Sequence, residues 1–71
     1  MLYILNPDFG HEVKNARKKI HLTQSALAES INISTRYLQA IENEGKMPDY
    51  AILGCILYRL EIPIERIFML K

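Results

Sequence analysis

The strongest constraint on this chain is the regular recurrence of residues that begin helices. Thr23, Ser34 and Asp49 each stand directly before a run in which apolar side chains recur at helical spacing, and all three are favoured N-cap residues. The turn signal at residues 6–8 makes Asp8 a further cap candidate. Intervals this short leave room only for brief helices, so the sequence predicts a compact all-α fold.

Five short helices follow from these signals. The expected spans, with their capping residues, are 8–20, 23–31, 34–44, 49–60 and 63–68. Asn32 tolerates the left-handed backbone that ends many helices, and Gly45 and Pro48 close the third span. The apolar side chains expected on the inner faces are Phe9, Val13, Ala16, Ile20, Leu27, Ala28, Ile31, Leu38, Ile41, Ile52, Leu53, Ile56, Leu57, Leu60, Ile64, Ile67 and Phe68.

The stability of so small a domain must come from helix packing, self-association or both. Cys55 is the single cysteine, which excludes an intrachain disulfide. His11 and His21 lie too far apart in sequence to suggest a structural zinc site. Hydrophobic residues make up 49% of the chain, with only 3 Gly and 3 Pro, which is the composition of a packed globular protein.

The N-terminal extension, residues 1–8, departs from the helical pattern. Residues 2–5 are apolar and compatible with a short β-strand. Such a strand needs a partner, which either residues 67–70 or the same segment of a second subunit would supply. We expect residues 1–71 to form a single domain, because no linker, repeat or low-complexity segment interrupts them.

Several classes of protein do not fit this pattern. The longest apolar run, 51–58, is far shorter than the ~20 residues that span a bilayer, and the N-terminus lacks a signal-peptide pattern, so we expect a cytoplasmic protein. His11-Glu12 does not extend to a zinc-protease motif, because position 15 is Asn15. No cofactor, metal or small-molecule motif is evident. The net charge of +1 is weak evidence for nucleic-acid binding.

The informative segment is 23–42, in which two short helices are joined by a tight turn. Ala28 is a small residue where the helices would cross, Asn32 occupies the turn, and Leu38 and Ile41 fill the angle between the helices. This is the pattern of a helix-turn-helix, whose second helix enters the major groove of DNA. On one exposed side that helix would present Thr35, Arg36, Gln39 and Ala40.

This segment resembles the helix-turn-helix of phage Cro and repressor proteins, also called the Xre-like family. The matching motifs are Thr23-Gln24, Leu27-Ala28-Glu29, Asn32-Ile33-Ser34, Leu38-x-x-Ile41-Glu42 and the closing run 60–68. The resemblance covers about residues 12–68 and implies a five-helix, lambda-repressor-like domain. The family usually has glycine where this chain has His21 and Asn32, and Pro63 replaces the usual serine cap.

The resemblance also implies roles for individual residues. The positions that match base-reading residues are Thr35, Arg36, Gln39 and Ala40. The positions that match phosphate contacts are Gln24, Ser34, Tyr37, Asn43 and Lys46. Arg17 and Glu42 match a partly buried salt bridge between the first and third helices. An arginine such as Arg36 pairs bidentately with guanine, and a glutamine such as Gln39 with adenine.

The resulting hypothesis is a sequence-specific transcriptional regulator, most often a repressor in this family, that binds a near-palindromic operator as a homodimer through helix 35–43. Two such helices would lie ~34 Å apart, one turn of B-DNA. The candidate dimer surfaces are the end of the 49–60 helix, residues 61–66 and residues 1–5. The alternative is a protein-interaction module, antitoxin-like or adaptor, with the same fold. An enzyme is not expected, because no nucleophile–base pair, carboxylate pair or metal cluster is evident.

Overall fold

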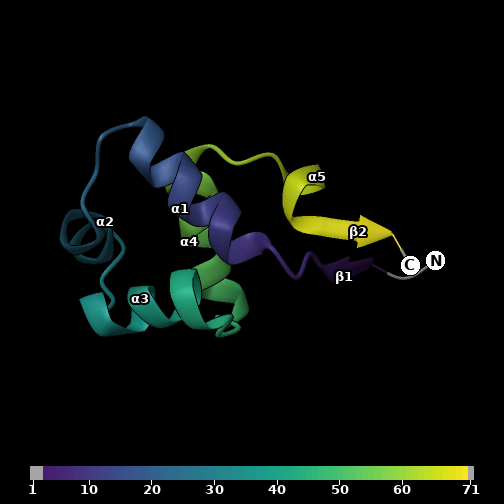
Figure 1. Cartoon of the computed structure of the whole chain (residues 1–71), viewed down its shortest axis with the longest axis horizontal. Helices are drawn as coiled ribbons and strands as arrows, with labels where there is room; N and C mark the ends of the chain where they lie inside the picture. The colour runs from purple at the N-terminus through teal and green to yellow at the C-terminus, as the bar shows by residue number, and fades with distance from the viewer. Residues whose placement is uncertain (1–2, 71) are drawn as a thin grey trace.

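Helices account for most of the structure, which is a computed structural model describing residues 3–70 (Figure 1). Within these residues the helices are α1 (Phe9–Lys19), α2 (Gln24–Ser30), α3 (Thr35–Glu44), α4 (Tyr50–Leu60) and α5 (Ile64–Ile67). The strands are β1 (Tyr3–Leu5) and β2 (Phe68–Leu70). The predicted five-helix, all-α fold is confirmed, with a small sheet added at one end of a molecule that measures 36 × 20 × 19 Å.

Three of the four predicted helix caps are present. The side chain of Thr23 accepts a hydrogen bond from the Ala26 amide at 3.0 Å, and that of Ser34 accepts from the Tyr37 amide at 3.0 Å. Asp49 Oδ1 accepts from the Ile52 amide at 2.9 Å. Each cap therefore satisfies one of the amides that the first turn of its helix leaves unpaired.

The prediction that the Asp8 side chain caps α1 is wrong. Asp8 stands at the N-cap position but makes no side-chain cap hydrogen bond. Asn6 accepts hydrogen bonds at this end of α1 instead. Its Oδ1 accepts from the Asp8 amide at 2.9 Å, and its carbonyl accepts from the Phe9 amide at 2.9 Å. The asparagine two residues upstream forms an Asx turn, which organises the entry to the helix.

Left-handed residues follow the ends of four helices, where the chain must reverse. Asn32 has φ 60° and His21 also has φ 60°, at the two positions where the family usually has glycine. Gly45 (φ 70°) ends α3 and Glu61 (φ 53°) ends α4. The expectation for Asn32 is thus confirmed, and His21 takes the same conformation despite its larger side chain.

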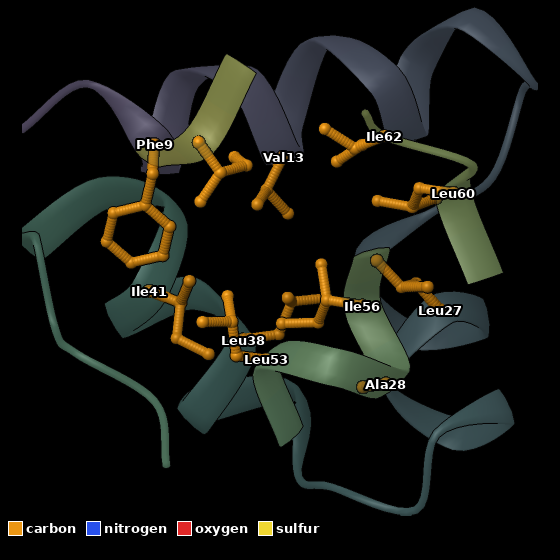
Figure 2. Close-up of a cluster of buried hydrophobic side chains, with 11 residues drawn as sticks. Phe9, Val13, Leu27, Ala28, Leu38, Ile41, Leu53, Ile56, Leu60 and Ile62 are labelled. Carbon is orange, nitrogen blue, oxygen red and sulfur yellow. The ribbon is translucent and has the colours of Figure 1, made fainter. Parts of the chain in front are cut away.

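The core lies between α1, α3 and α4, as Figure 2 shows, and α2 closes it on one side. Its buried members are Phe9, Val13, Leu27, Ala28, Leu38, Ile41, Leu53, Ile56, Leu60, Ile62 and Ile67. Two residues predicted to face inward do not. Ile20 is 45% exposed because α1 ends at Lys19, and Ile64 is 61% exposed because only Ile67 of the single-turn α5 points inward.

The strand predicted at 2–5 is present as β1, with Leu2 outside the described residues. It pairs antiparallel with β2 of the same chain, in the register Leu5↔Phe68. Phe68 is therefore in a strand and not in the fifth helix, because the pairing with β1 extends the backbone there. Asn6 joins this sheet to α5 by donating from its amide to the Ile67 carbonyl.

Candidate nucleic-acid interface

The angle between α2 and α3 is fixed by backbone hydrogen bonds across their turn. The amide of Ile33 donates to the Ala28 carbonyl at 2.9 Å, and the amide of Asn32 donates to the Glu29 carbonyl at 3.2 Å. Leu27 and Ala28 are buried under the turn. These hydrogen bonds close the end of α2 and set the path of the turn, and the apolar packing beneath the turn holds α2 and α3 together.

A glycine allows α1 and α3 to approach closely. A Cβ atom at Gly10 would lie 2.6 Å from the Ile41 carbonyl oxygen and 3.0 Å from that of Glu42. Both atoms belong to backbone and cannot move aside, so only glycine permits this contact. Glycine inside a helix costs stability relative to alanine, which is the one sequence signal that Gly10 serves a packing role, and it does not identify α3 as the neighbour.

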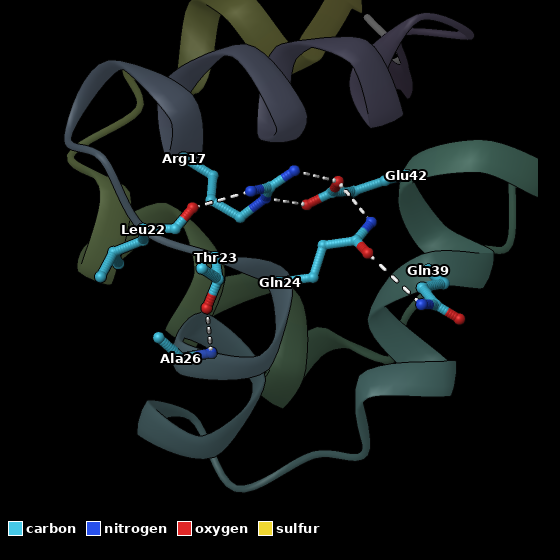
Figure 3. Close-up of polar contacts among 7 residues, drawn as sticks. All are labelled: Arg17, Leu22, Thr23, Gln24, Ala26, Gln39 and Glu42. Atoms are coloured by element: carbon cyan, nitrogen blue, oxygen red, sulfur yellow. Dashed lines mark hydrogen bonds and ion pairs between the residues drawn. The ribbon is translucent and has the colours of Figure 1, made fainter.

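Behind α3 lies the ion pair that the resemblance implies. Arg17 Nε donates to Glu42 Oε2 at 2.8 Å and Arg17 Nη2 donates to Oε1 at 3.0 Å, a bidentate pair (Figure 3). The two side chains are 8% and 0% exposed, respectively. Arg17 Nη1 also donates to the Leu22 carbonyl at 2.7 Å, so the guanidinium ties α1, the α1–α2 connection and α3 together. The role of Leu22 depends on a backbone atom and leaves no signal in the sequence.

The same network reaches the exposed side of α3. Gln24 Nε2 donates to Glu42 Oε1 at 3.1 Å, and Gln24 Oε1 accepts from Gln39 Nε2 at 3.4 Å (Figure 3). Glu42 therefore orients Gln24, and Gln24 in turn holds Gln39, whose side chain is exposed. This contact unites one predicted phosphate-binding residue with one predicted base-reading residue.

The four predicted base-reading residues belong to the first six residues of α3. Arg36 and Gln39 are exposed, and Thr35 and Ala40 are half-buried. Arg36 and Ala40 also line a hollow that holds three of the predicted phosphate contacts, Ser34, Tyr37 and Lys46, together with Glu44. Lys46 Nζ lies 5.5 Å from the centroid of the Tyr37 ring, a cation–π distance that keeps this cation beside α3.

Asn43 does not join this group. It lines a different hollow, between the beginning of α1 and the end of α3, together with Gly10 and His11. Seven of the nine predicted DNA-contacting residues thus fall in two sets, the hollow beside α3 and the Gln24–Gln39 contact. Thr35 begins α3 outside both sets, and Asn43 lines the separate hollow.

A model of the helix-turn-helix family matches residues 13–65 of this chain, the span from α1 to α5. The chain belongs to the Cro/phage-repressor type, or Xre-like, helix-turn-helix family. Proteins of this family are DNA-binding regulators, so the chain is a DNA-binding domain of the helix-turn-helix type, in which α2 and α3 form the helix-turn-helix. A search of curated proteins gave no match.

Membrane-spanning helices and metal-binding clusters are absent from the part of the chain that the structure describes. No helix in residues 3–70 is long and apolar enough to cross a bilayer. Over the same residues, no group of three or more His, Cys, Asp or Glu side chains is arranged to hold a metal ion.

Proposed function

We propose that this protein is a transcriptional repressor that binds a near-palindromic operator as a homodimer, with α3 of each subunit in the major groove. The observation that carries the proposal is the polar, outward side of α3 held on a rigid support. A helix reads base edges only when its side chains are fixed relative to the groove. The Arg17–Glu42 ion pair holds α3 from behind, and the hydrogen bond from Gln39 to Gln24 holds one of its outward side chains.

Within the groove, Arg36 is the strongest candidate for a base contact. Its side chain is exposed near the beginning of α3, and the N-terminal residues of a recognition helix are those that approach base edges. Arg36 would donate two hydrogen bonds to guanine O6 and N7, and Gln39 would pair with adenine. The methyl group of Ala40 or of Thr35 would contact the methyl of thymine.

Contacts to phosphate would fix the register on each side of α3. Gln24 begins α2, where the free amides of the first turn favour an anion. Ser34, Tyr37 and Lys46 line the hollow next to Arg36 and would contact the other edge of the groove. Asn43 was also predicted to contact phosphate, and its separate position predicts that removing its side chain lowers affinity least.

The decisive experiment is selection of bound duplexes from a random DNA pool at near-physiological salt, with Arg36→Ala selected in parallel. We expect the wild-type protein to enrich an inverted repeat whose half-site centres lie ~34 Å apart. The Arg36→Ala variant should lose the preference for guanine at one position of each half-site and retain it elsewhere.

A matched control is Lys18→Ala, which removes an exposed cation from the last turn of α1, outside the helix-turn-helix. It should leave every base preference unchanged. If the wild-type protein enriches no sequence at either physiological or lower salt, the proposal is contradicted. A repression assay with the selected operator placed over a promoter then tests the sign of regulation.

A further inference from the structure

The outer face of α4 has a composition unlike the rest of the surface. Tyr50 and Tyr58 are 89% and 87% exposed, and the residues between them on that face, Ala51, Gly54 and Cys55, are exposed as well. From Tyr50 to Tyr58 the helix contains no charged residue. An exposed helix face that is uncharged and carries two fully accessible aromatic rings is typical of a surface that binds another protein.

The shape of this face suits a second helix. Tyr50, Gly54 and Tyr58 are spaced by four residues, as are Ala51 and Cys55, so all five lie in two adjacent rows. The small residues occupy the middle and the tyrosines the ends. A Cβ atom at Gly54 would meet nothing within 4 Å, so the middle of the face is open to an approaching helix.

The charges at the two ends identify the partner. Asp49 precedes α4 and is exposed, and Arg59 is exposed at the other end. Glu61, the other charged residue at that end, lines a hollow beside α1 instead. If two copies of α4 cross antiparallel about Gly54, the end of each helix that carries Asp49 lies beside the end of the partner that carries Arg59, and each tyrosine lies against the partner's opposite end. A parallel crossing would bring like charges together, and it would also align the helix dipoles unfavourably.

We propose that the exposed face of α4, defined by Tyr50, Ala51, Gly54, Cys55 and Tyr58, binds the same face of a second copy in an antiparallel, two-fold arrangement. A face with small residues at its centre and opposite charges at its ends is complementary to itself under a two-fold rotation, as an isologous dimer requires. The inference rests on the homodimer of the proposed function and assigns its interface. This interface differs from the end of α4, residues 61–66 and residues 1–5 considered from the sequence.

The test compares Gly54→Lys with Gly54→Ala in the full chain. Both replace a helix-interior glycine that has open space around it, so neither should lower the thermal midpoint of the monomer. In sedimentation velocity, the wild type and Gly54→Ala should move from monomer to dimer with rising concentration. Gly54→Lys buries two like charges at the centre of the interface and should raise the dimer dissociation constant by at least about tenfold.

Cys55 provides an independent readout, because it is the single cysteine of the chain and exposed at the proposed centre. A short bis-maleimide should join two wild-type chains through Cys55, and Gly54→Lys should suppress this product. A wild-type protein that stays monomeric at high micromolar concentration, or a Gly54→Lys variant that dimerises like the wild type, would overturn the inference and leave the face to a different protein.

Binding to a duplex with a single half-site separates this inference from the proposed function. Gly54→Lys should bind the single half-site as the wild type does and lose only the extra affinity for the inverted repeat. Wild-type protein that cross-links through Cys55 but binds no DNA would contradict the proposed function and not the α4 interface. Selection of an inverted repeat by a protein that does not cross-link would contradict the interface alone.

Discussion

The two helices α3 and α4 follow one another in the chain and are built alike, yet they differ on both faces. Each begins with a side-chain N-cap, Ser34 or Asp49, and each ends at a left-handed residue. On the outside, α3 carries hydrogen-bonding side chains such as Arg36 and Gln39, whereas α4 carries tyrosines and small residues without charge. Local signals thus determine that a helix forms, and the outer face determines what it binds.

The inner faces differ as well. The inner face of α4 is apolar, with Leu53, Ile56 and Leu60 buried. That of α3 combines Leu38 and Ile41 with the buried carboxylate of Glu42. Apolar contacts stabilise without fixing direction, but a bidentate ion pair has a single favourable geometry. We infer that α3 is held in direction as well as in place because it must fit a groove, and that α4 needs only to be buried on one side.

The largest expected effect tests this difference. Glu42→Ala should lower the free energy of unfolding by ~3–5 kcal/mol, because it leaves the Arg17 guanidinium buried without a carboxylate. Ile56→Val, which removes a single carbon from the inner face of α4 without leaving a charge unpaired, should cost only ~0.5–1.5 kcal/mol. Urea denaturation of both variants measures the two values.

A double variant shows whether the cost arises from the unpaired charge. Arg17→Met with Glu42→Leu removes both charges, and it should recover most of the stability that Glu42→Ala loses. It should nevertheless bind DNA less selectively, because Gln24 loses the acceptor that orients it toward Gln39. A double variant as unstable as Glu42→Ala would show that packing and not charge dominates.

The next effect compares one arginine on each helix. Arg36→Ala should reduce affinity for the selected operator by ~1–3 kcal/mol and relax specificity at one base pair. Arg59→Ala removes the same charge from α4 and should leave the base preference of a single half-site unchanged. Titration of labelled half-site duplexes that differ at one position measures both, and equal losses of preference would remove the distinction between the two faces.

Much of this fold could be predicted because its signals are local. The caps at Thr23, Ser34 and Asp49 need only a polar residue and the amide three residues later, so one short pattern specifies each. Asp8 fits the same pattern, but the neighbouring Asn6 competes for its role. A local rule therefore fails where two adjacent residues satisfy it.

The parts that could not be predicted depend on distant contacts. Phe68 is compatible with helix or strand, and its pairing with β1 on the opposite end of the chain decides between them. At the site, the exposed side of α3 follows from helical spacing. The Gln24 contacts to Glu42 and Gln39 bridge 18 and 15 residues of sequence, respectively, and require the fold to be known.

A smaller effect concerns the left-handed residues that end α3 and α4, Gly45 and Glu61. Gly45→Ala should destabilise the protein by ~1–2 kcal/mol, because a Cβ atom is unfavourable at φ 70°. Glu61→Gly should stabilise it by up to ~1 kcal/mol, since glycine relieves the same strain at φ 53° while adding flexibility to the unfolded chain. Thermal denaturation gives both values, and a destabilised Glu61→Gly would show that the glutamate side chain contributes contacts that outweigh its backbone strain.

The smallest expected effect separates the two roles of Asp49. Ser34→Ala and Asp49→Ala should each cost ~1 kcal/mol, because each removes the acceptor of one helix cap. Asp49→Asn keeps the cap and removes the charge. It should therefore lower the free energy of unfolding by less than Asp49→Ala does. If Asp49 also faces the partner's Arg59, Asp49→Asn should still weaken the dimer in sedimentation experiments. Equal dimerisation of Asp49→Asn and wild type would restrict Asp49 to capping, and the orientation of the two α4 helices would then depend on their tyrosines alone.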